Sequence, residues 1–303
     1  MSARFGPRQL AAFIAVAELS SFTRAAVRLH LTPSAVSSLI GEFEDTLRFQ
    51  LFSRNTRKVS LTSQGRRFLP AAIAAQRQFR LAEIAAEDAR EGSFEILRVA
   101  APQVMASMIL PGLIEEFSST NPRVRVRIRD SGVVWLTELV ESGEADLALG
   151  PEAPSNDFVR SRRIFSSPWV LWCAPTHAFA TSSTLRWQDL RKASLCMAGT
   201  DHEQSLPPLP KNAPGSRSAA SMEIVDNITT ALGMAAAGRY VTMSPAYVGV
   251  LAKPMGLTMR RLGSPSLNRH VSLFSPAKRG QSSGALAFAE FVFASLSQRF
   301  DET

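Results

Sequence analysis

The sequence predicts a multidomain α/β protein, and three observations lead to this class. Residues 1–62 carry three short amphipathic helix patterns followed by a basic turn. Residues 63–91 have the pattern of one long helix. Residues 92–303 alternate strand and helix patterns, which is typical of a largely parallel sheet covered by helices. A chain of 303 residues that is 45% hydrophobic has room for more than one buried core.

The charge of the chain is positive and unevenly spread. The formal net charge is +8 and the sequence pI is about 10.3. Residues 1–65 contain eight Lys and Arg and four Asp and Glu, so 8 − 4 = +4 falls in the first part of the chain. This concentration predicts a polyanionic partner for the N-terminal domain.

Composition argues against several other classes of protein. Cys173 and Cys196 are the only cysteines, too few for a disulfide framework or a zinc site, so we expect buried free thiols. No signal peptide is visible and no stretch approaches about 20 apolar residues, so we expect a cytoplasmic protein with no membrane partner.

Catalytic motifs are missing from the sequence as well. It contains no Gly-rich phosphate loop, no Gly-x-Ser-x-Gly elbow and no HExxH. Asp201, His202 and Glu203 are adjacent and cannot all converge on one ion. We therefore expect no enzyme activity, no catalytic residue, no metal site and no cofactor.

The first three helices are defined by apolar stripes and by caps. Ser21 is placed to cap the second helix, while Thr32 caps the third and Pro33 occupies its first position. Helices this short are not stable alone, so they must pack on one another. The three stripes, spaced i, i+3, i+4 and i+7 with one further turn in the third, are Leu10, Phe13, Ile14 and Ala17; Phe22, Ala25, Ala26 and Leu29; and Val36, Leu39, Ile40, Phe43 and Leu47.

The opposite face of the third helix carries small polar residues, namely Ser34, Ser37, Ser38 and Gly41. A solvated face usually collects Lys, Glu and Arg, although an ordinary polar surface is the simplest alternative. Small hydroxyl side chains permit close approach to a DNA groove and bind phosphates or base edges. The two helices joined by a tight turn therefore predict a helix-turn-helix.

A basic hairpin follows the third helix. Phe52 and Val59 flank a tip that contains Arg54, Arg57 and Lys58. A basic turn between two short strands can reach phosphates or the minor groove beside the main contact. The first domain, residues 1–62, is thus predicted to be a winged helix-turn-helix that binds double-stranded DNA.

Residues 8–70 also resemble the DNA-binding region of LysR-type transcriptional regulators. The matching segments are RQLAAFIAVAELSSFTRAAVRLHLTPSAVSSLIGEFEDTL at 8–47 and LFSRNTRKVSLTSQG at 51–65. The resemblance implies that the third helix enters the major groove, with Ser21 and Thr23 on the DNA backbone. The family often has Arg where this chain has Ser38 and a long polar residue where it has Gly41, which implies sparse base readout by this helix. The predicted DNA-binding residues are Ser21, Thr23, Thr32, Pro33, Ser34, Ser37, Ser38, Arg54, Arg57 and Lys58.

The long helix at 63–91 carries a seam of small and aromatic residues spaced alternately by four and three, which is typical of a coiled coil. Packing against its own domain is the alternative, but pairing with a second copy is favoured, and the family's linker helix dimerises. Two copies would recognise an inverted-repeat operator. The seam is Phe68, Ala72, Ala75, Phe79, Ala82 and Ala86.

Residues 92–303 are predicted to be an α/β effector domain. Strands are expected at 96–100, 124–128, 145–150, 169–174, 194–198 and 271–275, and helices at 105–117, 133–141, 226–237 and 285–296. Arg123, Arg125, Arg127 and Arg129 alternate along one strand and are expected to form a solvated sheet face.

This region is similar, more loosely, to the effector domain of the same family, through LRVAAP at 97–102, ESGEADLALG at 141–150, APTHAFA at 174–180 and AAAGRYVTMSP at 235–245. The resemblance implies two subdomains of periplasmic-binding-protein type, about 92–164 with 268–303 and about 165–267. The chain should cross between them near 162–166 and return near 262–270, forming a cleft.

Ligands of open α/β sheets bind beyond the carboxyl ends of the strands. Many relatives place Ser or Thr in the first of these loops, where this chain has Gln103 between Pro102 and Val104, so a carboxylate-binding role is not carried over. Ordinary loop polarity is the alternative for each residue singly. The predicted effector-binding residues are Pro102, Gln103, Val104, Asp130, Ser131, Gly150, Gly199, Thr200, Asp201, His202 and Asn227.

The sequence therefore favours a LysR-type regulator that binds an operator as a homodimer or homotetramer and responds to a small molecule of unknown identity, with RNA polymerase as a further candidate partner. Two rivals stay open. One is a stand-alone small-molecule binding protein, and the other is an architectural DNA binder without sequence specificity.

Overall fold

The computed structural model describes residues 5–53, 59–90, 92, 94–153, 157–182, 185–199, 222–264 and 266–301. The chain divides into two compact units, residues 1–92 and 93–303, and each is described by itself.

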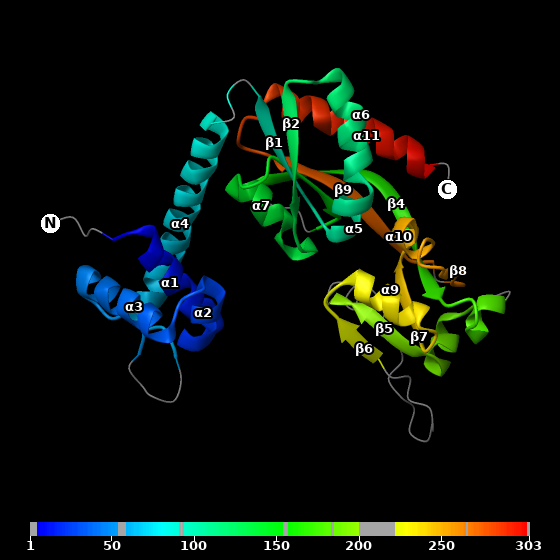
Figure 1. Ribbon diagram of the computed structural model, residues 1–303, viewed down its shortest axis with the longest axis horizontal. Helices are drawn as coiled ribbons and strands as arrows, with labels where there is room; N and C mark the ends of the chain where they lie inside the picture. The colour runs from blue at the N-terminus through cyan, green and yellow to red at the C-terminus, as the bar shows by residue number, and fades with distance from the viewer. Residues whose placement is uncertain are drawn as a thin grey trace. The chain divides into compact units, whose positions relative to one another are not determined.

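Unit 1 contains three short helices, a pair of hairpin arms and one long helix (Figure 1). Its buried centre is aromatic: the Phe13 ring lies 6.1 Å from that of Phe43 and 5.6 Å from that of Phe52. The predicted caps are confirmed, since the hydroxyl of Ser21 accepts from Arg24 N–H at 3.3 Å and that of Thr32 from Ala35 N–H at 3.2 Å. The helices are α1 Pro7–Leu19, α2 Phe22–Leu29, α3 Pro33–Leu47 and α4 Ser63–Arg90.

Helix α4 uses only the first part of its seam inside unit 1. Ala72 is buried in the unit's core, and Phe68 and Ala75 pack against it. Further along, the side chain of Phe79 is 44% exposed and Ala82 is also exposed. The beginning of the seam therefore packs against its own domain, and only the later part is available to a second copy.

Unit 2 is built on strands that follow one another in the order β2-β1-β3-β9-β4-β7-β5-β6, with β8 paired to β4. Strands β1, β2 and β3 are mutually parallel, and so are β5, β6 and β7. The strands are β1 Glu95–Ala101, β2 Val124–Asp130, β3 Leu147–Pro151, β4 Val159–Cys173, β5 Ser194–Ala198, β6 Met222–Val225, β7 Tyr240–Pro245, β8 Thr258–Arg261 and β9 Asn268–Pro276.

Helices cover both faces of these strands. Strand β3 separates two clusters, since Leu149 faces the one that includes Phe117 and Phe288, while Ala148 faces the one that includes Leu136. The helices are α5 Gln103–Met108, α6 Leu110–Thr120, α7 Leu136–Ser142, α9 Ile228–Ala236, α10 Gly249–Ala252 and α11 Ser283–Asp301. Short 3-10 turns are η1 Val133–Trp135, η2 Ala178–Thr181, η3 Trp187–Lys192 and η4 Ala246–Val248.

Two long strands join two subdomains within unit 2, as Figure 1 shows. Strand β4 pairs with β9 as far as Pro168, then with β7 from Trp169 and with β8 from Val170. The chain returns after β8, and β9 begins at Asn268 opposite Pro168. The crossing lies slightly beyond the predicted 162–166, and the return falls inside the predicted 262–270.

Two predicted elements differ from the structure. The helix expected over 105–117 is broken at Ile109 into α5 and α6, because Pro111 offers no N–H and its ring excludes the carbonyl four residues earlier. The strand expected at 169–174 is the end of the fifteen-residue β4, whose earlier part is exposed at Arg160, Arg162 and Arg163 and lacks an apolar alternation.

Candidate functional sites

The N-terminus of α3 presents the predicted small polar face to solvent. Ser34, Ser37 and Ser38 are all exposed, and the hydroxyls of Thr32 and Ser34 lie 3.0 Å apart. Pro33 is exposed in the first turn and Thr23 on α2, while Ser21 is half-buried at its cap. The described DNA-contact candidates from α2 and α3 are therefore at the surface.

Gly41 lies on the same face in the middle of α3. No heavy atom of the described structure outside the local backbone comes within 4 Å of a Cβ built on it. A mid-helix glycine costs about 1 kcal/mol relative to alanine. Packing within unit 1 gives no reason for glycine here, whereas close approach of a DNA groove would.

The arms of the predicted hairpin are paired. Phe52 and Leu61 form an antiparallel bridge, and Ser53 N–H donates to Ser60 O at 2.8 Å. The predicted contact residues Arg54, Arg57 and Lys58 lie outside the described residues, so only the base of the hairpin is placed.

Two residues that sequence reasoning missed fix this hairpin. The Glu44 carboxylate on α3 accepts from Leu51 N–H at 2.6 Å and Phe52 N–H at 3.1 Å. A Cβ on Gly65 would lie 2.2 Å from the Leu51 carbonyl oxygen, so only glycine fits at this position in the first turn of α4. Thr62, the predicted cap, accepts from Gly65 N–H at 2.9 Å. The one sign of the role of Glu44 in the sequence is that a carboxylate stands next to the apolar stripe of α3.

Unit 2 contains a cavity of about 570 Å³ between its subdomains. It lies where the carboxyl ends of β1, β2 and β3 meet those of β5 and β6 and the turn after β7. This is the edge at which ligands bind in open α/β sheets. Of the predicted effector-binding residues, those that line it are Pro102, Gln103, Val104, Asp130, Ser131, Gly199 and Asn227.

Of the remaining predicted effector residues, Gly150 does not line the cavity. A Cβ on Gly150 would lie 2.3 Å from Cδ1 of Leu136, so this glycine packs behind the wall and its neighbour Pro151 lines the cavity. Thr200, Asp201 and His202 lie outside the described residues.

Several lining residues were not anticipated from the sequence. Tyr247 and Val248 follow β7, whose parallel pairing with β5 brings its carboxyl end to the same edge. The strand pattern at 240–245 could have identified this turn. The other unanticipated lining residues are Met105, Gly132, Val133, Val134, Pro151, Ala198, Asp226 and Ile228.

Tyr247 connects the cavity to the crossing strands. Its backbone N–H donates to the buried Ser167 hydroxyl of β4 at 3.0 Å, and its ring meets Phe165 edge-on at 6.0 Å. The next pair along the crossing is Ser166 and His270, whose Oγ and Nδ1 atoms lie 2.6 Å apart. Tyr247, which lines the cavity, therefore directly contacts one of the strands that join the subdomains.

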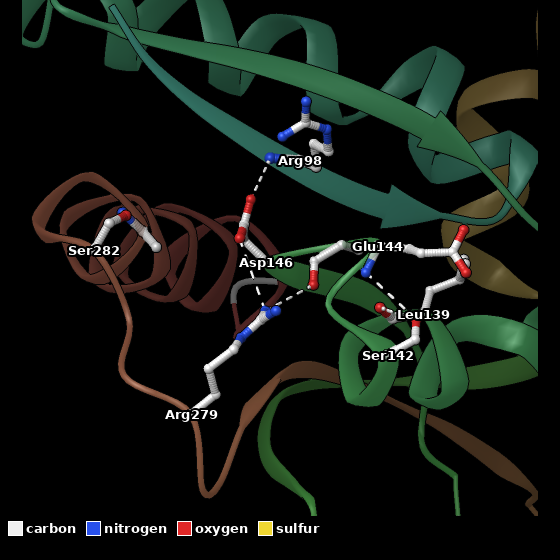
Figure 2. Close-up of polar contacts among 9 residues, drawn as sticks. Arg98, Leu139, Ser142, Glu144, Asp146, Arg279 and Ser282 are labelled. Carbon is white, nitrogen blue, oxygen red and sulfur yellow. Dashed lines mark hydrogen bonds and ion pairs between the residues drawn. The ribbon is translucent and has the colours of Figure 1, made fainter. Parts of the chain in front are cut away.

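The segment ESGEADLALG fixes the opposite end of the sheet (Figure 2). The Asp146 carboxylate accepts from Arg98 N–H at 2.8 Å, and Arg279 lies 3.8 Å from the same carboxylate. Gly143 ends α7 with φ of +80°, a left-handed conformation that favours glycine. Asp146 lies before the start of β3, whereas the cavity lies at the other end of that strand. The role of Asp146 is therefore structural.

Burial shifts the pKa of three titratable side chains of unit 2. Burial raises the pKa of the Cys173 and Cys196 thiols, which confirms the expected buried free cysteines. Burial lowers the pKa of His177, whose Nδ1 accepts from Phe179 N–H at 3.1 Å at the start of η2. Across the described ranges, no group of three metal-ligating side chains comes together. None of the described helices is both long and apolar enough to cross a membrane.

A helix-turn-helix unit joined to a second unit with a cavity between its two subdomains defines the class of ligand-responsive DNA-binding regulators. The profile described as "Bacterial regulatory helix-turn-helix protein, lysR family" matches residues 7–66, and "LysR substrate binding domain" matches residues 90–297. The chain belongs to the LysR family: it is a DNA-binding transcriptional regulator with an effector-binding domain.

Individual relatives agree with this assignment. The chain is 28% identical over 291 residues to the uncharacterized HTH-type transcriptional regulator YfeR of Shigella flexneri, covering 94% of this chain and 92% of that protein. Its fold is similar to that of CbnR, a LysR family transcriptional regulator, with a TM-score of 0.60, 21% identity and coverage of 96% and 99%. Full-length CbnR in complex with its target DNA gives a TM-score of 0.59 at 21% identity, with coverage of 96% and 100%.

Proposed function

We propose that two copies of the protein bind an inverted-repeat operator and that a small molecule in the cavity of unit 2 modulates this binding. The observation that carries the DNA part is the exposed hydroxyl face of α3 beside the anchored hairpin arms. We assign DNA contact to Ser21, Thr23, Thr32, Pro33, Ser34, Ser37, Ser38, Arg54, Arg57 and Lys58.

The cavity supports the effector part of the proposal. Its volume of about 570 Å³ falls within the range of small-molecule sites, roughly 300–1,000 Å³. Because its walls come from both subdomains, a ligand that contacts both favours one arrangement of them over another. The size of the response is limited by the ligand's differential affinity for the two arrangements.

For assembly we propose pairing through the later part of α4, where Phe79 is exposed, with further contacts between effector domains. Two linked readers raise the effective concentration of the second binding event. The domain limits proposed are 1–62, 63–91 and 92–303, with subdomains at about 92–164 with 268–303 and about 165–267. The protein would act in the cytoplasm on chromosomal DNA, without catalysis, and RNA polymerase is a candidate partner at the promoter.

The test is a footprint of the purified full-length protein on the DNA upstream of its own gene, at moderate salt. We expect protection of two half-sites spaced by about one helical turn or a multiple of it. Equal affinity for that fragment and for random duplex would favour an architectural binder. The absence of any protected site would contradict the proposal.

A further inference from the structure

We propose that the effector is an amphipathic molecule with a protonated amine, held between Asp130 and Asp226, and not a carboxylate. This inference rests on the proposed effector function of the cavity and specifies the ligand's charge.

Asp130 and Asp226 line the cavity from different subdomains. Asp130 is the last residue of β2, and Asp226 directly follows β6. Both residues are exposed, and both side chains are carboxylates. Among the described residues that line the cavity, none is Lys, Arg or His. The described walls therefore attract a cation and repel an anion.

The same pair couples ligand charge to the arrangement of the subdomains. Two carboxylates on opposing walls repel each other more strongly as the walls approach. A bound cation reverses the sign of that interaction, because it attracts both walls at once. An anion would add a third negative charge and favour separation. A cation thus has the differential affinity that a population shift requires.

The rest of the lining suits the apolar part of such a molecule. Val133 and Val134 follow β2, and the Val134 side chain is 66% exposed. Met105 and Ile228 add apolar surface from the two walls, and Gln103 and Asn227 offer neutral amides. Covering exposed apolar side chains favours binding in proportion to the area removed from water. The lining therefore fits an apolar body with a charged end.

The experiment compares three probes that share one apolar body: phenethylamine, phenethyl alcohol and phenylacetate. Their dissociation constants are measured by ligand-observed NMR on the full-length protein and on Asp130→Asn, Asp226→Asn and Asp157→Asn. Asp157 is an exposed carboxylate that does not line the cavity, so its variant is the matched control. We expect the amine to bind about tenfold more tightly than phenylacetate, with the alcohol between them, since partly exposed charge pairs are individually weak.

The preference for phenethylamine over phenylacetate should persist in Asp157→Asn. In Asp130→Asn and Asp226→Asn the two dissociation constants should become nearly equal. The inference is overturned if phenylacetate binds as tightly as the amine, if both cavity variants keep the wild-type preference, or if none of the probes binds. A DNA footprint on the same preparations separates the two proposals. A retained footprint leaves DNA binding standing when the charge preference fails, and a lost wild-type footprint overturns the DNA-binding proposal whatever the probes do.

Discussion

Short residues on α3 set how closely the predicted DNA-contact surface can approach a groove. The side chains of Ser34, Ser37 and Ser38 are short, so the helix backbone has to come close to a groove before they can reach it. Gly41 extends the same face without any side chain. The face is therefore suited to close approach more than to long-range base contacts.

Replacing Gly41 with Ala tests this interpretation directly. Without DNA, we expect Gly41→Ala to raise the free energy of unfolding by about 1 kcal/mol, because alanine favours the helix. Operator affinity should fall several-fold, because the added methyl group separates helix and groove. Gly112→Ala on α6, also with open space around the built Cβ, is the control and should stabilise without changing affinity. Unchanged affinity in Gly41→Ala would remove Gly41 from the binding surface.

We expect Glu44 to affect DNA binding through the hairpin that it holds. Its carboxylate accepts two backbone N–H groups, and bonds to an ionised acceptor are stronger than neutral ones. We expect Glu44→Gln to lower the free energy of unfolding by about 1 kcal/mol and to weaken operator binding. The measurement pairs urea unfolding with fluorescence anisotropy on labelled DNA. The neighbouring exposed Glu42→Gln removes the same charge without these bonds, so equal losses in both variants would assign the effect to net charge alone.

At the scale of elements, α4 is divided between two roles. The unit's own core takes up Phe68, Ala72 and Ala75, while Phe79 stays exposed on the later turns. Periodicity detected the whole seam but could not assign its beginning to the unit's own core. Packing against the own domain and pairing with a second copy require the same spacing of apolar residues.

The exposed part of α4 gives a prediction about assembly. Phe79→Glu should weaken self-association at least about tenfold, since it removes apolar contact and places like charges together in a symmetric pair. Operator affinity should fall with it. Sedimentation velocity over a concentration series measures the association. The adjacent exposed Gln78→Glu adds the same charge, and a loss of similar size there would show that Phe79 is not part of the interface.

Periodicity predicted most elements of unit 2 but missed the break at Ile109, the first part of β4 and strands β6, β7 and β8. The strand at 194–198 agrees with the structure to the residue. The first part of β4 was missed because Arg162 and Arg163 are exposed and ion-paired, Arg162 with Glu290 at 2.6 Å and Arg163 with Glu152 at 2.8 Å. These pairs connect distant parts of the chain, so no local pattern reveals them.

For the whole molecule, the rule that ligands bind at the carboxyl ends of parallel strands located much of the cavity in advance. It identified Pro102, Asp130 and Asn227 but not Asp226 or Tyr247. The two missed residues depend on how β6 and β7 are ordered beside β5, and strand order is not encoded in local spacing. Glu44 and Gly65 were missed for a similar reason, since their roles depend on contact with the hairpin arms.

The proposed DNA binding depends above all on contact between DNA and the exposed face of α3. The most direct measurement is operator affinity of the full-length protein carrying both Ser37→Asp and Ser38→Asp, because two carboxylates there would face phosphates. We expect operator affinity to fall by a factor of about one hundred or more. The free energy of unfolding should change by less than about 0.5 kcal/mol, because Ser and Asp have similar helix propensities. The control carries Ser282→Asp and Ser283→Asp, two exposed serines of unit 2, and should bind like wild type. Wild-type affinity in the α3 variant would contradict the account, since it would place the DNA on another surface.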